Sequence, residues 1–191
     1  MLITVTGASG SGKSNIAEYL TQLNKNIVHL NIDLVGHEVL ESDLVKPLVI
    51  KQFNLELIDG KIDRKKLGEL VFNSQEKMQE LSNLIWEYMQ KIIDDFILKN
   101  KDKIIVLDWI LIPKSKYYQM SDLNILVNAS FDTRMERTMI RDNIEADKFF
   151  EREQATLDFS KNEFDYVIYN DDLENTKRLV KSIYDKSIVS G

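Results

Sequence analysis

The chain has 191 residues, a formal net charge of −6, two histidines and no cysteine. This length fits one domain with a small insertion, and the lack of cysteine excludes disulfides, thiolate nucleophiles and thiolate metal sites. The mildly acidic balance disfavours broad nucleic-acid binding, no apolar run approaches the ~20 residues of a membrane helix, and no signal-peptide pattern is present, so we expect a cytoplasmic protein without nucleic-acid or membrane partners.

Apolar periodicity predicts strands that alternate with helices along the chain. In chain order, the expected elements are a strand at 2–6, a helix to about 23, a strand at 27–32, a helix at 34–41, a turn at Asp59-Gly60, a short helix around 67–71, a long helix after 74, strands at 104–107 and 123–127, helices around 133–140 and 148–157, a strand at 166–169 and a closing helix through 179 and 183. Five strands alternating with helices predict an α/β fold with a parallel sheet covered by helices on both faces.

The long helix carries its own start signal and an apolar face. Asn73 or Ser74 is expected to cap it, and Glu76 is placed for a capping box on Asn73. Apolar residues recur at spacings of three and four, which puts them on one face and indicates core packing. They are Met78, Leu81, Ile85, Tyr88, Ile92 and Phe96.

The segment Gly7–Ser14 fits the phosphate-binding pattern G-x-x-x-x-G-K-[ST] at every fixed position, between an expected strand and an expected helix. Backbone N–H groups in such a loop form an anion nest, and the helix start adds positive potential. We expect Lys13 to reach the β- and γ-phosphates and Ser14 to hold Mg²⁺. Three of the seven glycines fall within six residues, which argues against a chance glycine-rich turn. The motif therefore predicts a nucleoside triphosphate site.

Two aspartates follow expected strands at the sheet edge where ligands bind in parallel α/β folds. Asp33 suits a general base or a ligand of Mg²⁺ through water, and it suits the N-cap of the next helix equally well. Asp108 ends the strand expected beside the first, where a Walker-B-type aspartate helps to hold Mg²⁺; a strand-end turn is the alternative. The D-x-x-G match at Asp33–Gly36 is weak, and no N-K-x-D guanine signature is present.

Arg134, Arg137 and Arg141 are spaced three and four apart, so they share a helix face. A kinase lid needs arginines to neutralise phosphate charge, and their late position fits one. The alternative is an exposed face with ion pairs to neighbouring carboxylates. The candidate partners are Asp132, Glu136 and Glu145.

Three more residues are ambiguous without further context. Arg64, taken alone, is a surface arginine, and His29 lies within an apolar strand and is expected in the core. His37 lies one turn after Asp33 on the expected helix, so it is placed to face the same cleft. Two histidines make no metal site.

Five segments match longer patterns or are similar to them. They are the loop at 6–14; Asn31–Val39, against D-A-D-x-x-A-H-x-V; Asp59–Gly68 with Val71-Phe72, against G-x-[IL]-D-R-x-x-L-x-x-x-[VI]-F; Arg137 with Arg141-Asp142, against R-x-x-x-R-D; and Phe164–Asn170, against A-D-x-V-I-x-N. Together they resemble the dephospho-CoA kinase family over nearly the whole chain. The third and fifth are the most specific, because other P-loop kinases do not share them.

The resemblance implies ATP-dependent phosphorylation of the ribose 3′-hydroxyl of dephospho-CoA, with Mg²⁺. The implied catalytic residues are Asp33, as general base, with Lys13, Arg137 and Arg141. The implied nucleotide-binding residues are Gly7, Gly10, Ser11, Gly12, Lys13, Ser14, Asn15 and, near the adenine, Asn170. The implied acceptor-binding residues are Asp33, His37, Arg64 and Asp108, and the implied metal-holding residues are Ser14 and Asp108.

The resemblance also implies how the domain is divided. We expect one P-loop kinase domain over 1–191, as a monomer or weak homo-oligomer. Its core would lie at about 1–40, 101–135 and 160–191, with a helical acceptor-binding insertion at about 41–100 and a lid at about 136–158.

The sequence departs from the family patterns at several places. Trp86-Glu87 replaces His-Pro, Asp108–Lys114 replaces D-x-P-L-L-F-E, Phe150 occupies the position of a lid arginine near Arg152, and Asn15 replaces the usual threonine. These changes lie mostly on the acceptor side. They keep open a kinase for another small acceptor, such as a nucleoside or nucleotide. A nucleotide-binding regulatory protein without catalysis, built on the same loop, is a second alternative.

Overall fold

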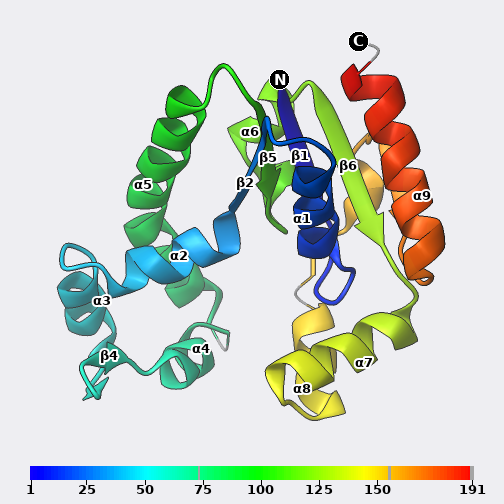
Figure 1. Ribbon diagram of the computed structural model, residues 1–191. Helices are drawn as coiled ribbons and strands as arrows, with labels where there is room; N and C mark the ends of the chain where they lie inside the picture. Colours follow the sequence, from blue (N-terminus) through cyan, green and yellow to red (C-terminus); the bar gives the residue numbers. More distant parts are fainter. Residues whose placement is uncertain (73, 155, 190–191) are drawn as a thin grey trace. The chain divides into compact units, whose positions relative to one another are not determined.

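The structure, a computed structural model, describes residues 1–72, 74–154 and 156–189. These residues form two compact units. Residues 1–31 and the chain from 100 onward build a unit around a parallel sheet, and residues 32–99 build a mainly helical unit (Figure 1).

The first unit contains a five-stranded sheet in the described ranges. Its strands are β1 (Leu2–Thr6), β2 (Ile27–Asn31), β5 (Ile104–Asp108), β6 (Leu123–Asn128) and β7 (Tyr166–Tyr169), in the order β2-β5-β1-β6-β7. Every pairing is parallel. The central strands β5 and β1 are almost fully buried and rich in apolar residues, as expected for strands covered on both faces. The predicted sheet is confirmed, with Asp108 ending the direct neighbour of β1.

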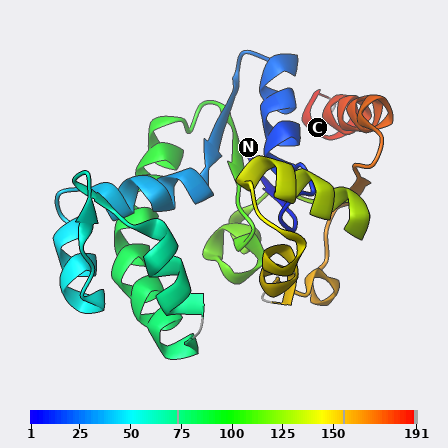
Figure 2. The same ribbon diagram turned by 90° about the horizontal axis from the view of Figure 1, so that it is seen from below.

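Helices cover both faces of this sheet. The helices are α1 (Lys13–Leu23), α6 (Lys116–Met120), α7 (Phe131–Asp142), α8 (Ala146–Gln154) and α9 (Leu173–Tyr184). Helices α1 and α9 lie side by side on one face and α6 lies on the other (Figures 1 and 2). Buried Ile16 and Leu20 of α1 meet Val180 and Ile183 of α9 in the main core. The α1–α9 pair therefore supports the sheet directly behind the loop that follows β1.

The predicted lid region forms α7 and α8. Helix α7 is N-capped by Ser130, whose Oγ accepts a hydrogen bond from the Thr133 N–H at 3.3 Å. It ends at Asn143, which adopts φ 50°. Helix α8 ends at Gln154, three residues before the expected end.

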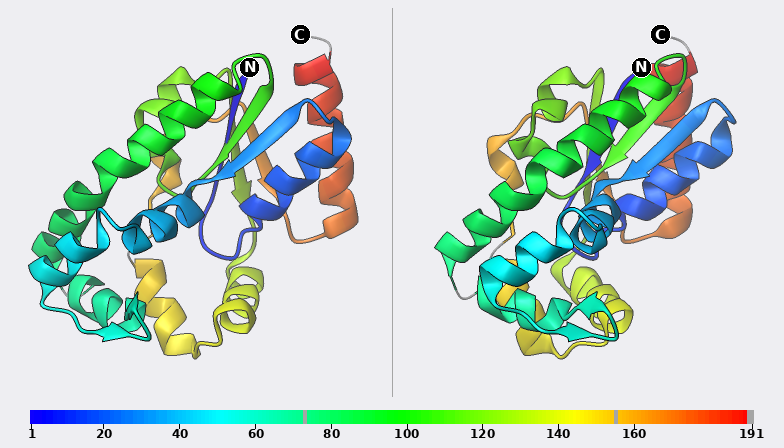
Figure 3. Two further views of the ribbon diagram at one scale, coloured as in Figure 1. Left: turned by 60° about the vertical axis from the view of Figure 1, so that its left-hand side comes forward. Right: turned by 90° about the vertical axis from the view of Figure 1, so that its left-hand side faces the viewer.

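The second unit contains α2 (Ile32–Glu41), α3 (Lys46–Phe53), a hairpin of β3 (Leu57–Ile58) and β4 (Lys61–Ile62), α4 (Arg64–Phe72) and α5 (Gln75–Lys99). Asp59 and Gly60 turn the hairpin with positive φ values of 50° and 76°, which confirms the predicted turn. Helix α5, in green, runs along the whole unit (Figure 3), and α2 and α4 pack against it.

The start of α5 and its apolar face differ in detail from the expectation. Ser74 caps the helix, because its Oγ accepts from the Lys77 N–H at 3.3 Å; Asn73 lies outside the described residues. The buried residues are Leu81, Met89 and Ile93, whereas Ile92 is exposed. The prediction placed Ile92 on the apolar face of the helix. With a period of 3.6 residues, it is Ile93 that faces the core at this position.

Two short helices were not expected. Helix α3 contributes only Val49 and Phe53 to the core, and α6 contributes only Tyr117. Segments this short carry too few apolar residues to show a helical period. In the described part of the chain, no helix has both the length and the apolar character needed to cross a bilayer.

Candidate active site

The phosphate loop is packed so closely that its glycines leave no room for side chains. A Cβ on Gly7 would lie 2.1 Å from the Val127 carbonyl oxygen, and one on Gly10 would lie 2.4 Å from the Arg134 carbonyl oxygen. Gly10 and Gly12 also adopt positive φ values of 77° and 89°, which favour glycine. The loop can therefore turn tightly between β1 and α1 and present its backbone to a ligand.

Asn170, at the end of β7, fixes the other side of the loop. Its Nδ2 donates to the Ser11 carbonyl oxygen at 2.8 Å, and this bond is buried. A Cβ on Gly12 would lie 2.2 Å from the same Nδ2. The backbone N–H of Asn170 is itself held by the Asn128 carbonyl at 2.7 Å. The structure therefore places the Asn170 amide on the loop backbone.

A cavity of about 370 Å³ opens in front of the loop. The lining residues are Gly10, Gly12, Lys13, Ser14, Asn15, Arg137 and Arg141. Three of them are cationic and, among the described residues, none that lines it is acidic. The start of α1 adds the positive end of a helix dipole. This arrangement suits a polyphosphate. The structure brings the loop residues and two of the three arginines, Arg137 and Arg141, to one cavity.

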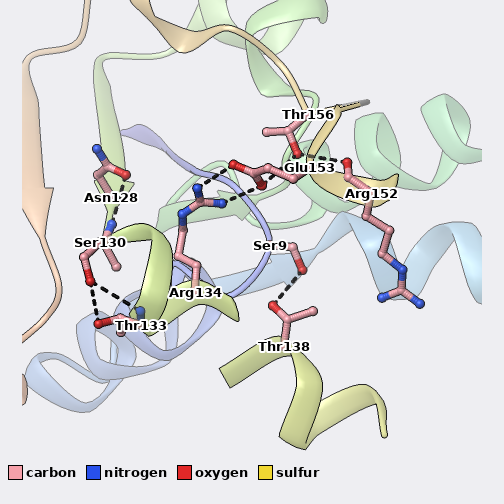
Figure 4. A network of polar contacts seen from close by, with 10 residues as sticks. Ser9, Asn128, Ser130, Thr133, Arg134, Thr138, Arg152, Glu153 and Thr156 are labelled. Atoms are coloured by element: carbon pink, nitrogen blue, oxygen red, sulfur yellow. Dashed lines mark hydrogen bonds and ion pairs between the residues drawn. The ribbon is translucent and has the colours of Figure 1, made fainter. Parts of the chain in front are cut away.

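Helix α7 contacts the loop through Ser9. Arg141 Nη2 donates to Ser9 Oγ at 3.1 Å. Thr138 Oγ1 lies 3.4 Å from the same oxygen (Figure 4). Arg141 also donates to Asp142 through Nε at 2.7 Å, and Asp142 pairs with Arg152. Hydrogen bonding from Arg141 holds the pKa of Asp142 below its usual value. These contacts place Arg141 beside the phosphate loop.

Arg134 has a different role from its two neighbours on the same helix. It is buried, and its guanidinium makes two hydrogen bonds to the Glu153 carboxylate, at 2.7 and 2.5 Å (Figure 4). The ion pair joins α7 to α8. The partners suggested by the sequence, which lie on or near α7, were wrong for Arg134, because Glu153 lies 19 positions away. Arg134 thus holds α7 against α8, and Arg137 and Arg141 line the cavity.

Asp108 and Ser14 provide the oxygen atoms expected for Mg²⁺. Asp108 is fully buried, and its Oδ2 accepts from Asn31 Nδ2 at 3.2 Å. The same Nδ2 lies 3.3 Å from Ser14 Oγ. Asp108 Oδ1 is also buried and accepts no hydrogen bond from the described residues. A carboxylate and a hydroxyl beside a polyphosphate cavity fit the donor set that Mg²⁺ prefers.

No group of three or more histidine, aspartate or glutamate residues, within 1–72, 74–154 and 156–189, is arranged to hold a metal ion. Any Mg²⁺ in this place would therefore draw fewer than three carboxylate or imidazole ligands from the described residues. Such partial coordination is typical of Mg²⁺ bound together with nucleotide phosphates and water.

The comparison with known proteins decides the family. The family model described as dephospho-CoA kinase matches residues 1–175. The dephospho-CoA kinases of Aquifex aeolicus and Bartonella quintana are 32% and 31% identical, over alignments that cover 96% and 95% of this chain and the same shares of those proteins.

The chain belongs to the dephospho-CoA kinase family. It is an ATP-using phosphotransferase with an alcohol group as acceptor. Among solved structures, the Thermus thermophilus protein TT1252 matches with a TM-score of 0.82 at 22% identity, covering 97% of both chains. The dephospho-CoA kinase from Campylobacter jejuni matches with a TM-score of 0.63 at 22% identity, covering 97% of this chain and 96% of that one. These likenesses support the fold.

Three of the residues matched to the family's acceptor side lie in the second unit. Strand β2 ends at Asn31 and α2 begins at Ile32, so Asp33 lies inside the first turn of α2. The N-cap alternative for Asp33 was therefore wrong, because an N-cap precedes the helix. His37 is one turn further and shares its helix face. Asp33 is half-buried, His37 is exposed, and Arg64 begins α4.

The departures from the family patterns also have a place in the fold. Phe150 packs against Phe131 of α7, with ring centroids 5.7 Å apart, so an aromatic contact replaces a lid arginine. Arg152 is engaged by Asp142. Trp86-Glu87 lies in the middle of α5, and Ile112 is fully buried in a 3₁₀ turn, Ile112–Lys114, after β5.

The lining of the loop gives a first prediction. Gly12→Ala combines a disfavoured φ with a clash against Asn170, so we expect at least a tenfold loss of ATP affinity, measured by titration calorimetry. Gly60→Ala is the matched control: its φ is 76°, but no atom lies within 4 Å of the added Cβ. A Gly12→Ala variant that binds ATP as tightly as Gly60→Ala would contradict the packing argument.

The Arg134–Glu153 pair gives a second prediction. Hydrogen bonding from Arg134 holds the pKa of Glu153 below its usual value. The resulting stability is present above the ordinary glutamate pKa of about 4.3 and is lost as pH falls through the lowered pKa. Glu153→Gln should therefore cost about 2 kcal/mol of unfolding free energy near neutral pH, and the cost should shrink in acid.

The measurement is denaturant unfolding of the wild type and the variant at a series of pH values. Glu151→Gln is the control, since Glu151 pairs with Lys148 in an exposed position and should contribute little. A difference between wild type and Glu153→Gln that stays constant into acid would show that the ion pair does not supply it.

Proposed function

We propose that this chain transfers the γ-phosphoryl group of ATP to the ribose 3′-hydroxyl of dephospho-CoA, giving coenzyme A and ADP. The observation that carries the proposal is the cavity in front of the phosphate loop, with Lys13, Arg137 and Arg141 around it. The family assignment supplies the acceptor. The hydroxyl oxygen forms a bond to the γ-phosphorus, the bond to the bridging oxygen breaks, and the hydroxyl proton passes to a base.

The donor half of the reaction follows from the first unit. The loop backbone and the start of α1 bind the phosphate chain. Lys13 and the two arginines would neutralise charge that spreads over the transferred group, which is the main catalytic effect in phosphoryl transfer. The contact of Arg141 with Ser9 keeps its guanidinium at the loop before ATP arrives, so little reorganisation is needed.

Ser14 and Asp108 would hold Mg²⁺ together with the β- and γ-phosphate oxygens. When bound, the ion supplies further charge neutralisation on those oxygens. The buried carboxylate of Asp108 supports this role, because an isolated buried charge is costly and a cation would compensate it.

The acceptor half rests on Asp33, His37 and Arg64. We propose Asp33 as the base that accepts the 3′-hydroxyl proton, with His37 and Arg64 binding the acceptor. The one-turn spacing of Asp33 and His37 on α2 supports a shared role. Four further expectations remain predictions. They are a helical acceptor-binding insertion, a lid formed by α7 and α8, a cytoplasmic location, and a monomeric or weakly associated state.

A kinase for another small acceptor is the second candidate. The observation that favours it is the pair of departures at Trp86-Glu87 and Ile110–Lys114, since both fall outside the phosphate-binding residues.

An acceptor panel separates the two candidates. Incubated with ATP and Mg²⁺, the protein should release ADP with dephospho-CoA at a kcat/KM at least a hundredfold above that of any nucleoside or nucleotide in the panel, because only the full acceptor would engage the site. ADP release is followed by a coupled assay. Turnover with a nucleoside and none with dephospho-CoA would overturn the assigned acceptor.

The base is tested by Asp33→Ala. We expect a loss of kcat of about a hundredfold or more, as is usual for a general base, with ATP affinity unchanged. Glu38→Ala, an exposed carboxylate on the same helix, should leave kcat within twofold. Unchanged turnover in Asp33→Ala would remove this residue from the mechanism. ATP binding with no turnover on any acceptor in the wild type would point to a regulatory protein.

A further inference from the structure

Asn31, the last residue of β2, connects the two groups expected to hold Mg²⁺. Its side-chain amide lies 3.2 Å from Asp108 Oδ2 and 3.3 Å from Ser14 Oγ, and in both cases Nδ2 is the donor. The two acceptors come from different elements, the end of β5 and the first turn of α1. A single amide group therefore sets the separation between the carboxylate and the hydroxyl.

The sheet register explains why Asn31 is in this place. Asn31 and Asp108 are direct partners in the parallel pairing of β2 with β5, so their side chains leave the sheet on the same face. His29 lies two residues earlier on β2 and shares that face. Its Nε2 is 3.5 Å from the same Asp108 oxygen. Two β2 side chains, Asn31 and His29, thus lie against the Asp108 carboxylate.

An amide and a carboxylate at position 31 would act differently. The family pattern D-A-D-x-x-A-H-x-V has aspartate there, and a second carboxylate 3.2 Å from Asp108 would repel it unless a cation lay between them. Asparagine instead donates a hydrogen bond to the buried charge, which offsets part of its desolvation. The amide can therefore hold Asp108 and Ser14 in place before a cation binds.

We propose that Asn31 is a positioning residue for the magnesium site, and that it prearranges Asp108 and Ser14 through its side-chain amide. The inference rests on the proposed function only in taking the loop as the site of a Mg²⁺-bound triphosphate. It does not depend on the identity of the acceptor. Groups of this kind, which orient metal ligands without touching the metal, typically change metal affinity 10- to 100-fold when removed.

The experiment measures Mn²⁺ binding in the presence of ADP by electron paramagnetic resonance, which counts free Mn²⁺ and requires no turnover. Asn31→Ala should weaken Mn²⁺ binding by about tenfold or more, while ADP affinity in EDTA changes less than twofold. Asn124→Ala is the matched control. Asn124, near the start of β6 in the same sheet, also makes two side-chain hydrogen bonds: its Oδ1 accepts from Thr4, and its Nδ2 donates to the Tyr118 carbonyl of α6.

A third variant, Asn31→Asp, tests the charge argument. It should melt at a lower temperature than the wild type in EDTA and regain that loss when Mn²⁺ and ADP are added, because the cation would separate the two carboxylates. Equal melting temperatures of Asn31→Asp and the wild type in EDTA would contradict the charge argument.

Two results would overturn the proposal. One is wild-type Mn²⁺ affinity in Asn31→Ala. The other is an equal loss of ADP affinity in EDTA, which would show a general disturbance of the loop. Absence of activity with dephospho-CoA in the wild type would instead contradict the proposed function and leave the Mn²⁺ result standing.

Discussion

The close packing of the phosphate loop is the constraint on which the rest of the site depends. A Cβ added to Gly7, Gly10 or Gly12 would lie only 2.1–2.4 Å from an atom of another segment of the chain. These atoms belong to β6, α7 and the end of β7. The loop conformation therefore depends on three elements that follow it by more than 100 residues.

The same packing directs the charges of the site. Because α7 lies against Gly10 and Ser9, the arginines one and two turns along that helix reach the cavity in front of the loop. Arg134, nearer the start of α7, joins this helix to α8 through its ion pair with Glu153. On the other side, the β2–β5 register brings Asn31 to Asp108. Cationic groups for phosphate and oxygen groups for a cation thus surround one loop, which is the arrangement that in-line phosphoryl transfer requires.

Much of the fold and of the nucleotide side could be predicted from the sequence. The strands at 2–6 and 104–107 are rich in apolar, β-prone residues, and the loop pattern fixes the positions of Lys13 and Ser14. The end of β2 was placed one residue too late, because the apolar Ile32 was included in the strand although sheet pairing stops at Asn31. The Arg134–Glu153 pair was missed because it depends on how two helices pack. For Asn31, the available signal was its two-residue spacing from His29 at the end of a strand.

The most direct test of the account is a crystal structure with a non-hydrolysable ATP analogue, Mg²⁺ and dephospho-CoA. The account predicts that the triphosphate lies on the backbone of Gly10–Ser14 with Lys13 and Arg137 in contact with it, and that the ribose 3′-hydroxyl lies within hydrogen-bond reach of Asp33 and in line with the γ-phosphorus. A triphosphate bound away from this loop, or a 3′-hydroxyl directed away from both Asp33 and the γ-phosphate, would contradict it.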